Sequence, residues 1–146
     1  MRSDYLNENS GKTASYKKKV ELVSAARTLA EADSGKVIVF TPPSSAGALV
    51  ITLPACNKGI ELKIIQISAY DTAVCKVLSA EGNNLVGGIM AQTGAGDNAA
   101  GTDDFIQFGS ATVAGDYVSL VSDGSKWYVV DSCSKVTTNG VVFGAS

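Results

Sequence analysis

Residues 115–131, GDYVSLVSDGSKWYVVD, constrain the fold of this chain more than any other segment. Apolar side chains occupy every second position of YVSLV, and the same alternation returns in WYVV after Asp123-Gly124. A period of two, carried by β-branched and aromatic residues, is typical of a β-strand, and Asp-Gly between two such runs favours a tight turn. We therefore predict an antiparallel β-hairpin, in which Val118 and Leu120 share one face.

The rest of the chain repeats this pattern of short strands and turns. Expected strands cover residues 19–23, 36–41, 48–53, 61–68, 73–78, 85–90, 105–108 and 136–143. Many short strands at regular spacing predict an all-β fold, either an antiparallel β-sandwich or a jelly-roll-like barrel. A chain of 146 residues can bury a core without metals or disulfides, so we expect one β-domain over residues 19–146.

Several local patterns add detail to this expectation. In residues 61–68, Ile65 and Ile67 fall on the face opposite to the other apolar residues, which predicts a strand buried on both faces. The Gly87-Gly88 pair indicates a bulge or a bend. Residues 24–32 have helix-forming composition, but the strand-rich context favours loop or strand. Residues 91–103 are expected to form the longest loop.

The first 18 residues differ in composition from the domain that follows. Tyr5, Leu6 and Tyr16 are their only sizeable apolar anchors, so the segment cannot offset its own ordering entropy. It is either a frayed end or an extended arm that orders against a neighbouring subunit. It lacks the apolar centre of a secretory signal.

Composition excludes several classes of function. The chain has no histidine, which removes the catalytic triads and zinc sites that need an imidazole. A net charge of −2 gives no reason to expect nucleic acid, and Lys17-Lys18-Lys19 is a solvated strand entrance more often than a polyanion site. No apolar run is long enough to span a membrane. Three cysteines without CxxC spacing indicate buried thiols and folding in a reducing cytoplasm.

Acidic residues offer the few candidates for chemistry. Asp97, Asp103 and Asp104 lie in or beside a Gly-rich loop, where oxygen ligands would suit calcium, but their spacing matches no calcium motif beyond fragments. A solvated loop is the simpler interpretation, so we expect neither a metal nor a cofactor. A glycosidase needs two carboxylates beside a cleft, and Asp97 with Asp104 would be the pair to test. The chain is therefore expected not to be an enzyme.

Trp127 and Tyr128 are two adjacent aromatic residues that could form a platform on which a carbohydrate ring stacks. Adjacent residues of a strand face opposite sides, so one of the two must point into the interior. A core tryptophan beside an exposed or interfacial tyrosine is the more economical interpretation.

One order of motifs goes beyond a generic β-protein. Arg27-Thr28-Leu29 precedes Asp33-Ser34-Gly35-Lys36 and the strand VIVF; ITLP, a glycine turn and ELKIIQI follow, and GDYVSLVSDG with KWYV comes last. Over roughly residues 27–131 this order resembles a module of tailed-bacteriophage virion proteins, namely small head decoration (cement) proteins and domains of tail fibres. The matching residues are turn, strand-end and packing residues, so the resemblance implies a fold and a virion setting but no catalytic residue.

The resemblance implies a capsid decoration protein on the outside of the head, made in the host cytoplasm, with the major capsid protein and itself as partners. Such proteins are commonly homotrimeric, with a terminal arm over neighbouring subunits. Tyr5, Leu6 and Tyr16 are then the contact residues of the arm, and Tyr117 and Tyr128 lie at a subunit interface. A chain of one module with an 18-residue arm suits this role better than the alternative, a receptor-recognising or adaptor module of a tail fibre.

Overall fold

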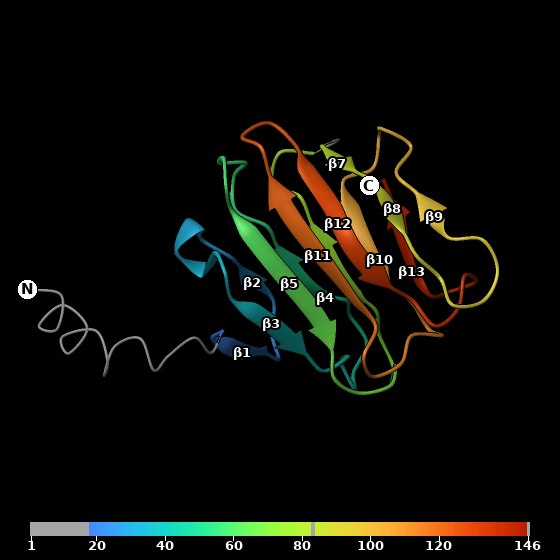
Figure 1. Ribbon diagram of the computed structural model, residues 1–146. Helices are drawn as coiled ribbons and strands as arrows, with labels where there is room; N and C mark the ends of the chain where they lie inside the picture. Colours follow the sequence, from blue (N-terminus) through green and yellow to red (C-terminus); the bar gives the residue numbers. More distant parts are fainter. Residues whose placement is uncertain (1–17, 83, 146) are drawn as a thin grey trace, which may run out of the picture.

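The chain folds into two β-sheets that pack face to face, with a small third sheet at one end (Figure 1). The computed structural model describes residues 18–82 and 84–145. Sheet A has six strands in the spatial order β1-β3-β5-β11-β12-β7. Their bounds are Val20–Val23 (β1), Val37–Phe40 (β3), Glu61–Gln66 (β5), Tyr117–Ser122 (β11), Trp127–Cys133 (β12) and Leu85–Val86 (β7).

Sheet B faces it with five strands in the order β13-β10-β6-β4-β2. They cover Val141–Gly144 (β13), Phe105–Phe108 (β10), Cys75–Leu78 (β6), Leu49–Thr52 (β4) and Arg27–Thr28 (β2). The third sheet pairs β8 (Gly88–Ile89) with β9 (Asp97–Asn98) and lies beside β12 and β13. The all-β prediction is confirmed, and of the two alternatives the sheets form a sandwich, since they do not close into a barrel.

The first six strands alternate between the two sheets. β1, β3 and β5 lie parallel and side by side in sheet A, and β2, β4 and β6 do the same in sheet B. The chain therefore winds around the core three times in one direction, one strand over at each turn, as in a β-solenoid. In these two sheets the antiparallel pairings all involve β10, β11, β12 or β13, and β8 pairs antiparallel with β9 in the third sheet.

This winding corrects the expectation of purely antiparallel sheets. Five of the ten strand pairings among the described residues are parallel, namely β1-β3, β3-β5, β2-β4, β4-β6 and β7-β12. The physical reason is that each pair of consecutive early strands is split between the sheets, so the next strand in the same sheet arrives from the same end. Parallel neighbours need such a crossover connection, which here runs through the opposite sheet.

The core lies between the sheets. Phe40 of β3 and Phe108 of β10 meet edge to face, with ring centroids 5.0 Å apart, and so join the two layers. Ile38, Ile64 and Leu120 from sheet A are fully buried against sheet B. Fully burying such a side chain is worth about 1.5–3 kcal/mol, so this layer holds the sandwich together.

The predicted hairpin is β11 and β12, paired antiparallel around a turn in which Gly124 has a φ of 103°. Val118 and Leu120 are both buried, as the alternation indicated. One feature was not predicted: Ser119 pairs with Asp131 and Leu120 with Val129, so Val130 is an extra residue in a β-bulge. The bulge leaves Val130 60% exposed.

Three local expectations have mixed outcomes. The strand from Glu61 is buried on one face only, because Ile65 is half-buried and Ile67 is 47% exposed on the outer side of sheet A. The expected bend at Gly87-Gly88 is confirmed, since Gly87 has a φ of 122° and separates β7 from β8. Residues 24–32 contain the strand β2 and part of the 3-10 turn η1 (Glu31–Asp33).

Within residues 18–82 and 84–145, no helix has the length and apolar character needed to cross a membrane.

Candidate interaction surface

The motif residues Asp33-Ser34-Gly35-Lys36 build an ion network at one end of the sandwich. Asp33 is buried, and its carboxylate lies 2.5 Å from Lys36 Nζ and 3.2 Å from Arg27 Nη2. Glu21 completes the network by pairing with Lys36 at 3.1 Å and with Arg27. Because Glu21 belongs to β1 and Arg27 to β2, the network ties the two edge strands together.

The Asp33 carboxylate also accepts a hydrogen bond from the backbone N–H of Ala30 at 2.9 Å. Burial raises the pKa of this carboxyl, but the Ala30 amide, Lys36 and Arg27 together outweigh burial and hold the pKa below its usual value. Gly35, with a φ of 79°, closes the turn that brings Lys36 back to Asp33. These residues are therefore structural, as the sequence indicated.

The second motif, the Ser122-Asp123-Gly124 turn, is also satisfied internally. The Asp123 carboxylate accepts the backbone N–H groups of Ser125 and Lys126, at 2.8 and 2.9 Å, and these lower its pKa to about 2. The Tyr128 hydroxyl donates to the same carboxylate at 3.0 Å. The turn therefore fixes the position of the Tyr128 ring.

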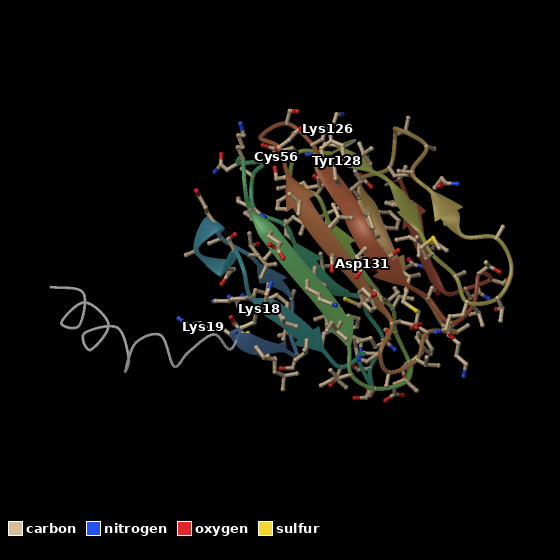
Figure 2. All side chains as sticks on the ribbon, viewed as in Figure 1. Lys18, Lys19, Cys56, Lys126, Tyr128 and Asp131 are labelled. Carbon is tan, nitrogen blue, oxygen red and sulfur yellow. The ribbon has the colours of Figure 1, made fainter. Side chains whose placement is uncertain are left out.

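The two tyrosines predicted at an interface lie on the outer face of sheet A, which we define as the face turned away from sheet B. The Tyr117 hydroxyl donates to both carboxylate oxygens of Asp131 at 3.0 Å, and this bond raises the pKa of Tyr117. Lys63 Nζ lies 4.1 Å from the centre of the Tyr117 ring. Figure 2 shows Tyr128 and Asp131 along β12, toward the viewer. Both tyrosines are half-buried.

Trp127 is fully buried, as the more economical interpretation predicted, and its indole nitrogen has no hydrogen-bond partner. A ring inside the core cannot stack on a sugar, so the pair of aromatics does not form a carbohydrate platform.

The part of the outer face formed by β1, β3 and β5 is mostly apolar, with Lys63 as a polar exception. Across β1, β3 and β5, Leu22 lies beside Val39 and Val39 beside Ile65, and a second row places Val20 beside Val37. Ile67 continues the face beyond β5, where its N–H donates to the carbonyl of Phe40. We call these six side chains the apolar patch: Val20, Leu22, Val37, Val39, Ile65 and Ile67.

The apolar patch is open to solvent. Val20 is 65% exposed and Leu22 is 60% exposed, and both belong to the edge strand β1. Single exposed apolar residues are ordinary on protein surfaces, but a contiguous group on one sheet face marks an interaction site. This patch was not predicted from the sequence, although apolar residues on both faces of VIVF and ELKIIQI were a signal for it.

The candidate metal ligands do not come together. Asp97 accepts the backbone N–H groups of Asn98 at 3.0 Å and Phe143 at 2.6 Å, and Asp103 accepts that of Ala100 at 2.5 Å. Asp104 is buried. Throughout the part of the chain that the structure describes, no three His, Cys, Asp or Glu side chains gather closely enough to hold a metal ion.

A cavity of about 310 Å³ lies between the third sheet and β13. Asp97 is the one acidic residue among the side chains that line it: Ile89, Ala91, Ala95, Gly96, Asp97, Thr137, Val141 and Val142. A glycosidase needs two carboxylates across its cleft, and here the single carboxylate is already held by two backbone amides.

Cys56 has a polar environment but not that of a nucleophile. The side-chain amide of Asn84 donates to its sulfur at 3.0 Å, and Glu81 accepts its backbone N–H at 3.1 Å. Burial and the neighbouring Glu81 raise the pKa of the thiol to about 11, so it stays protonated at neutral pH. Cys75 is buried as well.

The sequence matches no model of a known protein family and no curated protein. The predicted arm residues Tyr5, Leu6 and Tyr16 lie outside the described residues.

Proposed function

We propose that this chain is a structural virion protein of a tailed bacteriophage, a decoration protein that binds the outside of the head and stabilises its lattice. The observation that carries the proposal is the apolar patch on the outer face of sheet A, at the end of the sandwich where residues 1–17 join the domain. A surface of this kind supports binding to protein, and the order of motifs described above supports a virion setting.

The role of the motif residues supports the same proposal. Asp33, Lys36 and Asp123 hold turns and strand ends through internal bonds, so they maintain a shape and leave no reactive group for a substrate. The lattice would then be stabilised through thermodynamic linkage between binding of this protein and the state of the lattice. A protein that binds the mature lattice better than its precursor, or than the free subunits, shifts the equilibrium toward that lattice.

The major capsid protein is the proposed partner, together with further copies of this chain in a homotrimer on the capsid exterior. A tail-fibre module remains the alternative. Glycan recognition through Trp127 is not available to it, because that ring is buried in the core. It would depend instead on Tyr128 and on residues 91–103, which were expected to be one loop but contain the strand β9.

The test is to mix the purified protein with phage heads assembled without it, and then to sediment the heads. The proposal predicts saturable co-sedimentation and heads that resist heating better than undecorated ones. Heads that already carry the protein are the matched control, and they should take up none. Protein that stays in the supernatant while it binds host cells would favour the tail-fibre alternative and end the decoration proposal.

A further inference from the structure

The cavity between the third sheet and β13 has no part in the proposed function. Its volume of about 310 Å³ lies at the small end of the range for pockets that bind small molecules, which is about 300–1,000 Å³. The third sheet contacts β12 and β13, whereas the apolar patch begins on β1 at the other end of the sandwich (Figure 1). The cavity is therefore a separate candidate for a binding site.

The walls of the cavity are mostly apolar. Ile89 of β8 and Val141 of β13 line it, and both side chains are buried. Ala91, Ala95 and Val142 add further apolar surface. Walls of this kind favour an aliphatic chain, because its methylene groups leave water when they enter.

Two glycines allow the segment after β8 to lie close to these walls. Gly96 is so near the carbonyl oxygen of Ile89 that a Cβ at this position would collide with it. Gly94 has a φ of 81°, and a Cβ there would lie 3.1 Å from the hydroxyl oxygen of Thr137. The glycine-rich composition of this segment therefore has a physical role, which is to shape the rim of the cavity.

Asp97 is the one charged residue among those that line the cavity. Its Oδ1 accepts the backbone N–H of Asn98 at 3.0 Å and its Oδ2 accepts that of Phe143 at 2.6 Å, so the carboxylate is fixed between β9 and β13. A carboxylate has about four lone-pair sites, so it can accept from a further donor. Within the described chain the ion pairs of lysine and arginine all use other acids. The negative charge of Asp97 is therefore available to a cation from outside.

Thr137 supplies a second polar group to the lining. Its hydroxyl makes no hydrogen bond with any other residue that the structure describes. A hydroxyl oxygen accepts hydrogen bonds as well as donating them, so it can serve an N–H donor next to a carboxylate. A fixed negative charge attracts cations and repels anions. The lining therefore suits a ligand with a cationic N–H group at one end and an aliphatic chain at the other.

From these observations we propose that the cavity binds a primary alkylammonium group, carried either by a small free amine or by a lysine side chain of a partner protein. The ammonium group donates to Asp97 and to the hydroxyl oxygen of Thr137, and the alkyl chain lies along Ile89 and Val142. This is the way in which long cationic side chains usually combine an apolar stem with a charged end. The site needs no phage head, so the proposal does not depend on the decoration role.

The first experiment titrates the full chain with methyl-, ethyl-, propyl- and n-butylammonium chloride and follows the backbone amide signals by NMR. The signals of Gly96 and Phe143 should shift, and each added methylene should tighten binding by up to about fourfold, because it is buried against the apolar walls. Butanoate and 1-butanol carry the same chain without the positive charge. They should bind at least about tenfold more weakly than n-butylammonium.

The second experiment tests the residues that hold the ammonium group. Asp97→Asn removes the charge and should weaken n-butylammonium binding at least about tenfold, and Thr137→Val removes one acceptor and should weaken it roughly threefold. Asp123→Asn is the matched control, because Asp123 also accepts two backbone amides but lies outside the cavity. It should bind like the parent.

A further variant guards against the case in which Asp97→Asn does not fold. Val142→Phe keeps Asp97 and its two amide bonds but fills part of the cavity. It should weaken the binding of n-butylammonium more than that of methylammonium, because the longer chain needs the space that the ring takes.

The two sources of the ammonium group are separated with Nα-acetyl-lysine N-methylamide. This compound has the four-carbon amine of n-butylammonium attached to a peptide backbone. Binding as tight as that of n-butylammonium would identify the ligand as a lysine side chain of a partner protein. Binding at least about tenfold weaker would identify it as a small free amine, since the backbone then blocks entry. Both results support the alkylammonium site.

Three results would overturn the inference. The first is that no alkylammonium ion shifts the amide signals around the cavity. The second is that 1-butanol or butanoate binds as tightly as n-butylammonium, which would mean that the carboxylate does not select a cation. The third is that Asp97→Asn and Asp123→Asn change binding equally. None of these measurements uses phage heads, so their outcome is independent of the sedimentation test.

Discussion

Replacing Asp33 by Asn tests whether the ion network holds the open end of the sandwich together. The change keeps the shape of the side chain and an oxygen to accept the Ala30 amide, but it removes the negative charge that Lys36 and Arg27 share. Glu21 would then remain as the one carboxylate of the network.

The expected loss of stability follows from burial. Pairs of exposed charges are worth about 0–1 kcal/mol, and removing one partner of a fully buried pair costs about 3–5 kcal/mol. The Asp33 side chain is 7% exposed, while Arg27 and Lys36 are 30% and 24% exposed. We therefore expect Asp33→Asn to lower the free energy of unfolding by about 2–3 kcal/mol and the urea midpoint by roughly 1–2 M.

The pH dependence of the free energy of unfolding provides a second test with the same variant. The pKa of Asp33 is lower in the folded chain than in the unfolded one, so its contribution is complete above about pH 4 and is lost as pH falls through the folded pKa. The free energies of unfolding of the parent and the variant should therefore become equal in acid.

Urea titrations followed by Trp127 fluorescence measure both effects. The control is Asp71→Asn. Asp71 is exposed and its carboxylate accepts a hydrogen bond from the neighbouring Thr72 hydroxyl, so this change should alter the free energy of unfolding by less than about 0.5 kcal/mol. A loss for Asp33→Asn as small as that of the control, or a difference that persists unchanged into acid, would refute the role given to the network.

Other predictions concern the core, the thiols and the turn. Phe108→Ala should cost about 3–5 kcal/mol in urea unfolding, because Phe108 packs edge to face on Phe40 across the two sheets, and a cost under about 1 kcal/mol would contradict that packing. Iodoacetamide should label Cys133 in the native protein and all three cysteines in urea, since the other two are buried; rapid native labelling of a second thiol would disprove their burial. Carboxyl NMR should show Asp123 titrating near pH 2, and a normal pKa would mean that the amides of Ser125 and Lys126 do not hold it.

The sequence predicts the strands of this fold better than their arrangement. Alternation located the hairpin, the strand that ends before Pro54 and the short strand from Phe105 to Phe108, because burial on one face imposes a period of two wherever the partner strand lies. The same period carries no information on the direction of the neighbouring strand. The parallel winding of β1 to β6 was therefore not predictable from alternation alone.

The apolar patch shows a different limit of prediction from sequence. Apolar residues at both parities of VIVF and ELKIIQI were visible in the sequence, and burial on both faces was the natural interpretation. The structure instead leaves Ile67 and the outer side of β1 open, because sheet B covers only one face of sheet A. A residue pattern can indicate that both faces are apolar, but not whether the second cover comes from the same chain or from a partner.

The proposal that this chain decorates a phage head is tested most directly by its copy number per virion. Quantitative mass spectrometry of purified particles, calibrated against the major capsid protein, gives the ratio of the two chains. A head decoration protein should be present in hundreds of copies, in a fixed ratio to the capsid protein. A handful of copies would place the chain in the tail and contradict the proposal, and its absence from the particle would contradict the virion setting altogether.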